Sequence, residues 1–122
     1  QTAAGIRYIG FVPDEDLPGL YAGAEALILP SVYEGFGIPA VEAMSIGTPV
    51  LASNTTSLPE VVADAGILFN PMDVKDIAGK IEMALSMNKI ERQKLVKKGM
   101  IRAERFSWNI AVDKIIEVLH ER

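Results

Sequence analysis

The strongest constraint on the fold is a series of short apolar runs, each rich in branched residues and bounded by Gly, Pro, Ser or Asn. Runs of this length and composition are typical of buried strands. Helical patterns separate them, and the runs are unbroken rather than alternating, which favours an α/β fold whose parallel sheet is covered by helices on its faces. We therefore expect about four parallel strands, at residues 6–12, 26–30, 49–53 and 66–69.

Helix signals lie between and after these runs. Pro39 begins one helical pattern and Gly47 follows its end, which is the usual placement of Pro and Gly at helix termini. After Pro71 the chain becomes helical, with Asp73 as the expected N-cap of one helix and Ser107 as that of the last. The earlier helices are expected over residues 14–23, 39–47 and 57–65. Strands and helices in this order resemble the later half of a doubly wound sheet, followed by a helical C-terminal third.

Composition excludes several kinds of site. The 122 residues include no cysteine and one histidine, His120, so disulfide frameworks, zinc sites and Cys- or His-based triads lack their residues. No apolar run approaches the roughly 20 residues of a membrane span, and residues 1–8 lack the regions of a signal peptide. Because the chain has no initiator methionine and begins close to an expected strand, we interpret residues 1–122 as one partial domain of a longer protein.

Charge is segregated along the chain. Between residues 1 and 70 the single basic residue is Arg7, against eight acidic residues, whereas residues 89–105 hold seven basic and two acidic residues. A solvated helix face is the default interpretation of the basic run. A second interpretation is peripheral contact of residues 89–105 with an anionic lipid surface. Nucleic acid is not an expected partner.

The loop between the second strand and the helix that begins at Pro39 is the candidate site. In open α/β sheets, ligands bind beyond the carboxyl ends of the strands. Gly35 and Gly37 carry no Cβ, so the backbone can turn tightly and approach a ligand. Backbone N–H groups of Phe36, Gly37 and Ile38 could then point at an anion, and a phosphate is the expected guest.

Two glutamates flank this turn. Glu34 precedes it and Glu42 lies one turn inside the helix. Carboxylates repel phosphate but accept hydrogen bonds, so hydroxyl groups are their expected partners. A ligand with a central phosphate and hydroxyls at both ends is a sugar nucleotide. The alternative is an ordinary glycine loop in which Glu42 complements the charge of a helix terminus.

The pattern Glu34-x7-Glu42, written "EGFGIPAVE", resembles the E-x7-E signature of retaining GT-B glycosyltransferases, in particular glycosyltransferase family 4. The segments "IRYIGFVPDEDLPGLYAGAEALILPS", "TTSLPEVVADAGILFNPMD" and "RAERFSW" are also similar to that family, so the resemblance covers nearly the whole chain. It implies that the chain is the later half of a Rossmann-like, C-terminal donor-binding domain.

The resemblance also implies roles for individual residues. Glu34, the expected catalytic residue, would orient the transferred sugar through its hydroxyls, and Glu42 would accept hydrogen bonds from the ribose. The Gly35–Ile38 backbone would contact the sugar and the diphosphate. Near the first expected strand, Val12 would hold the base and Asp14 could accept from a guanine. An ordinary helix cap is an equal interpretation of Asp14.

The reaction implied is retaining transfer of a hexose from a GDP- or UDP-sugar to an acceptor hydroxyl, in polysaccharide or glycolipid assembly. The sequence looks most similar to bacterial or archaeal mannosyl- and glucosyltransferases, with a GDP-mannose or UDP-glucose type of donor. The family is generally independent of metals, so no metal site and no cofactor are expected. The acceptor glycan or glycolipid would bind a separate N-terminal domain, and the implied location is cytoplasmic, with peripheral membrane contact as an extension.

Three alternatives remain open at this point. The chain could be a binding module that recognises nucleotides or sugars without transferring them. It could belong to a nucleotide-sugar epimerase of GT-B architecture. It could also be a glycoside hydrolase with Glu34 and Glu42 as its acid and base, although such a pair must face each other across a cleft.

Overall fold

The computed structural model describes residues 2–3, 5–31, 37–55 and 57–120. Its centre is a parallel sheet with the strand order β3-β4-β5, in which Ile28 pairs with Leu51 and Leu51 with Ile67. The central strand is buried along its whole length, as expected for a strand with neighbours on both sides and helices on both faces. The strands are β3 (Leu27–Leu29), β4 (Val50–Ser53) and β5 (Ile67–Phe69).

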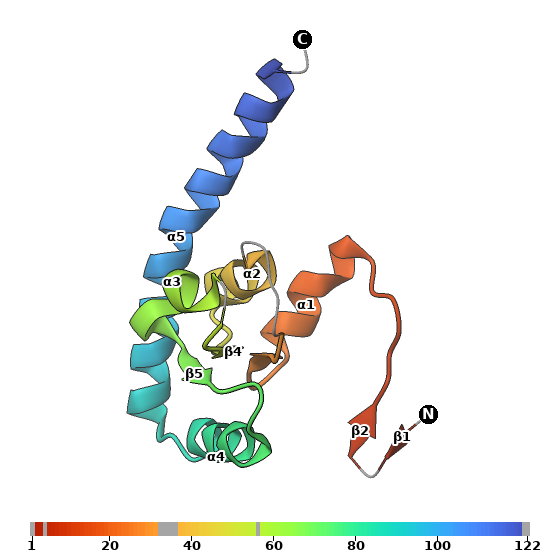
Figure 1. Ribbon diagram of the computed structural model, residues 1–122, viewed down its shortest axis with the longest axis vertical. Helices are drawn as coiled ribbons and strands as arrows, with labels where there is room; N and C mark the ends of the chain where they lie inside the picture. Colours follow the sequence, from red (N-terminus) through yellow and green to blue (C-terminus); the bar gives the residue numbers. More distant parts are fainter. Residues whose placement is uncertain (1, 4, 32–36, 56, 121–122) are drawn as a thin grey trace.

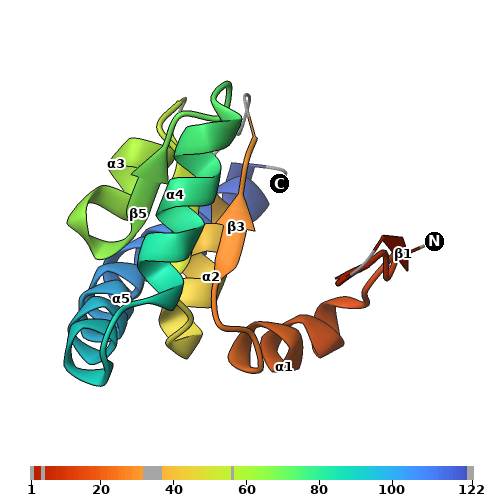
Figure 2. The ribbon, with the colours of Figure 1, turned by 90° about the horizontal axis from the view of Figure 1, so that it is seen from below.

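Helices cover both faces of this sheet (Figures 1 and 2). Successive side chains of a strand point to opposite faces. Val50 and Ala52 accordingly belong to the core shared with α2, α3 and α5, whereas Leu51 and Phe69 pack against Ile77 and its neighbours on α4. The helices are α1 (Leu17–Ala22), α2 (Ile38–Ile46), α3 (Leu58–Val62), α4 (Val74–Leu85) and α5 (Lys89–His120), with 3₁₀ turns η1 (Asp14–Asp16) and η2 (Ala63–Ala65). The α/β fold class predicted from the sequence is confirmed.

The prediction that residues 6–12 form the first strand of the parallel sheet is wrong. Residues Ile6–Arg7 form β2, which pairs antiparallel with β1 (Thr2–Ala3) and not with the parallel sheet. Gly10 adopts a left-handed φ of +68°, which an extended strand does not contain. Figure 1 shows this hairpin apart from the sheet. The parallel sheet therefore has three strands among the described residues, where four were expected.

The prediction that a separate last helix begins at Ser107 is also wrong, because α5 runs without interruption through this residue. Serine is a weak helix former, but its cost in a helix interior is well under 1 kcal/mol and no Gly or Pro follows to stop the helix. The C-terminal part of α5 extends beyond the rest of the molecule (Figure 1). In the described part of the chain, no helix is both long enough and apolar enough to cross a membrane.

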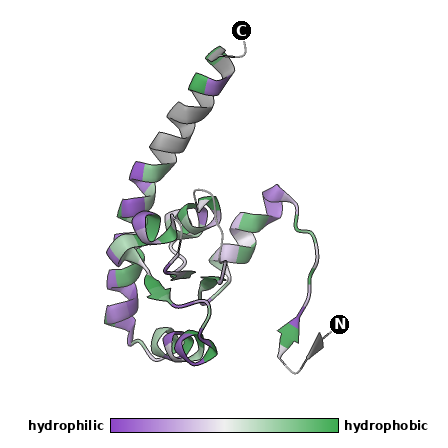
Figure 3. Cartoon of the chain, viewed as in Figure 1, coloured by the Kyte–Doolittle hydropathy of each residue, from purple (hydrophilic) through white to green (hydrophobic). Residues whose placement is uncertain are grey.

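Packing of α5 on α2 completes the core. Ala103 is fully buried, and a Cβ added to Gly99 would lie 3.4 Å from Cγ of Met44. Small residues four apart therefore allow the two helices to approach closely. In Figure 3 the strand β5 is hydrophobic, whereas hydrophilic residues recur along the first half of α5.

The predicted cap of α4 is confirmed, since Oδ1 of Asp73 accepts from the N–H groups of Lys75 and Asp76.

Candidate functional site

The carboxyl ends of the three parallel strands form one edge, and side-chain hydroxyls join the end of β4 to that of β3. Oγ of Ser53, which is fully buried, donates to the backbone oxygen of Leu29 over 3.2 Å. Two residues further along both segments, Oγ1 of Thr55 donates to the backbone oxygen of Ser31, also over 3.2 Å. These bonds hold the chain just before the candidate loop. The sequence showed a polar turn here, but nothing in it indicated which hydroxyls would cross between strands.

The helix α2 begins at this edge, directly after Gly37. That residue is buried and has a φ of +81°, which favours glycine. A Cβ at Gly37 would lie 3.1 Å from Cδ2 of Leu58, at the start of α3. The beginnings of α2 and α3 therefore pack together beside the strand ends. The free backbone N–H groups of the first turn of α2 lie at the edge where ligands of open α/β sheets bind.

Two predicted donor-binding residues share one face of α2. Ile38 is 43% exposed and Glu42 is also exposed, whereas Ala40, on the opposite side of the helix, and Val41, on an adjoining side, are buried. Residues four apart lie above one another on a helix. The structure thus places Ile38 and the Glu42 carboxylate together, one turn apart and open to solvent.

Tyr21 lies next to this face and was not predicted from the sequence. Burial raises the pKa of its phenol, and the negative charge of Glu42 raises that pKa further. The backbone oxygen of Tyr21 also accepts a 2.7 Å hydrogen bond from Oγ1 of Thr48, a buried residue just after α2. Tyr21 therefore joins α1 to the residue that follows α2 and lies near Glu42. Its neighbours in the sequence are mostly apolar, and no motif marks Tyr21 as part of a site.

The remaining predicted residues fall into two groups. Val12 is half-buried in the segment before η1, and Asp14 is the first residue of η1 and exposed. The N-cap of η1 is Pro13, and Asp14 belongs to its acidic first turn. Glu34, Gly35 and Phe36 lie outside the described residues.

Comparison with known proteins gives a consistent result. The family described as "Glycosyl transferases group 1" matches residues 1–102. The O-antigen chain mannosyltransferase B of Escherichia coli is 52% identical over 103 residues, which are 84% of this chain and 27% of the relative. The chain thus spans about a quarter of the length of that curated relative.

Solved structures agree with this match. The sucrose-phosphate synthase from Thermosynechococcus elongatus superposes with a TM-score of 0.80 and 30% identity over 94% of this chain and 29% of that protein. The Anabaena protein HepE, solved in complex with UDP and glucose, has a TM-score of 0.77 and 26% identity over 95% of this chain and 32% of that one. Because the family matches most of the chain and its fold recurs in these structures, the chain belongs to the glycosyl transferases group 1 family.

Proposed function

We propose that this chain is the donor-binding part, within residues 1–122, of a retaining GT-B glycosyltransferase that transfers a hexose from a nucleotide-diphosphate sugar to an acceptor hydroxyl. The observation that carries the proposal is the exposed pair Ile38 and Glu42 at the start of α2, beside the carboxyl ends of the parallel strands. A loop of this family's signature precedes the pair. The acceptor glycan or glycolipid would bind elsewhere in the longer protein.

The chemistry follows from the arrangement. The N-terminus of α2 carries partial positive charge and free N–H groups, which stabilise the negative charge of a diphosphate leaving group. The Glu42 carboxylate accepts hydrogen bonds from ribose hydroxyls, and Glu34 orients the sugar. In the proposed complex, the Gly35–Ile38 backbone would contact the diphosphate, and Val12 and Asp14 would contact the base. Rate enhancement then comes from positioning and from charge stabilisation, without a metal cofactor.

The proposed sugar is mannose, carried by GDP. The support is the 52% identity to an O-antigen mannosyltransferase, together with the exposed Asp14 carboxylate at the start of η1. A guanine offers N–H donors to such a carboxylate, whereas a uracil base offers fewer. UDP-glucose is the competing donor. The structure of HepE contains UDP and glucose, at 26% identity to this chain.

Amide NMR tests donor binding directly. GDP and UDP are titrated separately into the isotope-labelled protein, and the amide signals of residues 34–42 are followed. We expect the Gly37 and Ile38 signals to shift with GDP at lower concentration than with UDP, and the shifts to be lost in Glu42→Ala. The matched control is Glu82→Ala on α4, which also removes an exposed carboxylate. Shifts that are equal in Glu42→Ala and in the wild type would refute the role of Glu42.

Transfer itself requires an assay of the full-length protein. GDP release from GDP-mannose that depends on an added glycan acceptor, and that persists in EDTA, is the expected result. Binding without transfer would favour the non-catalytic module. Conversion of the sugar nucleotide to an epimer would favour the epimerase.

Membrane contact is a further part of the proposal, together with a cytoplasmic location. On α5, Lys94, Lys98, Ile101 and Arg105 are exposed on one side, and Ile101 is 60% exposed. Exposed cations with an apolar residue among them suit an anionic bilayer surface. Flotation with vesicles that contain phosphatidylglycerol should fall in the double variant Lys94→Glu with Arg105→Glu. Arg102 is left unchanged, because its guanidinium binds the backbone of α3.

A further inference from the structure

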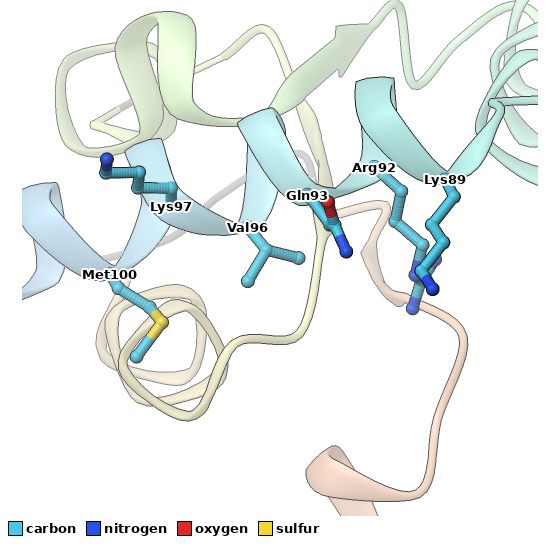
Figure 4. Close-up of a pocket in the computed structure, with 6 residues that line it drawn as sticks. All are labelled: Lys89, Arg92, Gln93, Val96, Lys97 and Met100. Atoms are coloured by element: carbon cyan, nitrogen blue, oxygen red, sulfur yellow. The ribbon is translucent and has the colours of Figure 1, made fainter.

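A different side of α5 carries a groove that the proposed transfer reaction does not use. Its volume is about 390 Å³. Figure 4 shows the side chains that line it, all from α5; Val96 and Met100 point toward the end of α2, whereas Lys97 extends to the side. The lining residues are Lys89, Arg92, Gln93, Val96, Lys97 and Met100.

The floor of the groove is apolar and firmly supported. Val96 and Met100 lie one helical turn apart, and Met100 is 45% exposed. Directly beneath them is Gly47, which ends α2 with a φ of +94°; a Cβ there would lie 3.4 Å from Cγ1 of Val96 and 3.8 Å from Sδ of Met100. Ile46, immediately before Gly47, is 37% exposed. The apolar strip is thus held by two packed helices.

Positive charge lies before this strip and beside it: Lys89 and Arg92 precede Val96 on α5, and Lys97 lies between Val96 and Met100. Lys89 and Lys97 are exposed and, within the part of the chain that the structure describes, neither takes part in an ion pair. Arg92 is 3.5 Å from a carboxylate oxygen of Glu25, so its charge is partly balanced. Eight residues of helix separate Lys89 from Lys97, which is about 12 Å along the axis. The groove therefore offers two cations about two turns apart that form no ion pair within the described residues, one before the apolar strip and one beside it.

We propose that this groove binds an acidic amphipathic helix of a partner protein. Grooves of this kind accept the apolar face of a helix, whose anchors recur every three or four residues. Apolar anchors of the partner would pack on Val96 and Met100, and acidic residues beside them would pair with Lys89 and Lys97.

The charges of this chain argue against a second copy as the occupant. Outside α5, the longest described helix is α4, whose sequence VKDIAGKIEMAL balances two acidic residues with two lysines. The helix α1 contains no acidic residue, and α2 contains one, Glu42. None of these helices has the acidic, amphipathic face that the groove complements. The acidic turn η1 is only three residues long, so no helix outside α5 in the described part of the chain supplies the complementary charge, and the proposal commits to a partner protein.

Fluorescence anisotropy with the full-length protein tests the proposal. The probe is a labelled, acetylated 18-residue peptide with leucines at helical spacing and glutamates on both flanks; a scrambled peptide of the same composition is the control. We expect saturable binding of the first peptide at low salt, and about tenfold or greater weakening in Met100→Asp and in Lys97→Glu, because each removes an anchor or a charge partner. Circular dichroism establishes that each variant is folded, and Lys97→Glu alters an exposed side chain that folding does not need.

Two neighbouring changes serve as matched controls. Ile101→Asp and Lys94→Glu introduce the same charges on the same helix but outside the groove. Peptide affinity of these variants should therefore stay within about twofold of wild type. Absence of saturable binding, equal binding of the scrambled peptide, or equal losses in the control variants would overturn the proposal.

The same variants separate the other occupants. If Met100→Asp and Lys97→Glu abolish vesicle flotation while the peptide does not bind, the groove contacts lipid and the proposal is wrong. If they instead convert an oligomer to a monomer in sedimentation velocity while the peptide does not bind, the occupant is a second copy of the chain.

Discussion

At the scale of single residues, Asp76 joins the end of β5 to the first turn of α4. Its Oδ2 accepts from the backbone N–H of Asn70 over 2.7 Å, and its Oδ1 lies 3.0 Å from Nζ of Lys80. The Asn70 hydrogen bond and then the Lys80 bond hold the pKa of Asp76 below its usual 3.8. A carboxyl whose folded pKa is depressed contributes stability above its unfolded pKa, and this contribution is lost as the pH falls through the folded pKa.

We therefore expect Asp76→Asn to lower the free energy of unfolding at neutral pH. The difference from wild type should begin to shrink as the pH falls below 3.8, the usual pKa that Asp76 has in the unfolded chain, and should vanish once the native carboxyl is also neutral. Urea unfolding at neutral and at acid pH measures both quantities. Glu82→Gln, on the same helix, is the control. A difference between Asp76→Asn and wild type that is constant with pH would contradict the ionised role of Asp76.

Gly66 provides a second prediction at this scale. A Cβ there would lie 2.3 Å from Cγ1 of Val62 and 2.8 Å from the backbone oxygen of Val50, so both α3 and β4 would have to move. Gly66→Ala should cost about 1–3 kcal/mol of stability through this overpacking. Gly79→Ala is the matched control, because nothing lies within 4 Å of its added Cβ and alanine is the better helix former, with a gain of about 0.5–1 kcal/mol. Thermal unfolding of the two variants should therefore shift in opposite directions.

At the scale of secondary-structure elements, Arg102 connects α5 to the end of α3. Its Nε donates to the backbone oxygen of Val61 over 2.7 Å, its Nη2 donates to that of Glu60, and its guanidinium lies 5.0 Å from the ring centre of Phe106. Arg102→Met keeps the apolar stem but leaves these carbonyls without their donor, so we expect a loss of about 1–3 kcal/mol. Arg105→Met, an exposed change three residues later, should alter stability by less than about 0.5 kcal/mol in urea unfolding. Equal losses of stability in the two variants would contradict a stabilising role for the hydrogen bonds of Arg102.

Local signals predicted most elements, but not their partners. The strands β3, β4 and β5 lie within the predicted runs, and Asp73 caps α4 as expected, because buried apolar runs and caps depend on neighbouring residues. The run at residues 6–12 was misassigned, since an apolar run does not specify which strand it will pair with, and neighbours in a doubly wound sheet need not be consecutive. Ser107 was misassigned because a serine is a cap only where the backbone before it leaves the helix.

The candidate site was predictable to a similar degree. Glycines and a proline at a strand-to-helix junction indicated the start of α2, and the four-residue spacing placed Ile38 and Glu42 on one face. The contacts that hold this face come from distant parts of the chain. Tyr21 and Leu58 reach α2 through tertiary packing, and Ser53 reaches β3 from the neighbouring strand. Sequence periodicity carries no information about such pairs.

At the scale of the whole molecule, apolar surface is concentrated at the N-terminal end. Ile6, Tyr8, Ile9 and Phe11 are 68%, 81%, 55% and 89% exposed, along one short segment beside the hairpin β1–β2. Contiguous apolar surface of this kind marks a site of association, whereas single exposed apolar residues are normal. The charge of the chain, −4 in total, is too small to oppose association strongly.

The 122-residue chain, expressed by itself, is therefore expected to self-associate through this segment at micromolar concentration. The double variant Tyr8→Ser with Phe11→Ser removes its two most exposed rings and should return the chain to a monomer in sedimentation velocity. Met72→Ser with Val74→Ser is the control, because these side chains are 79% and 80% exposed but lie apart from the segment, beside the start of α4. If the control reduces association equally, the driving force is general hydrophobicity rather than this segment. If the wild-type chain stays monomeric at all concentrations, the exposed apolar residues among 6–11 do not form a contact surface.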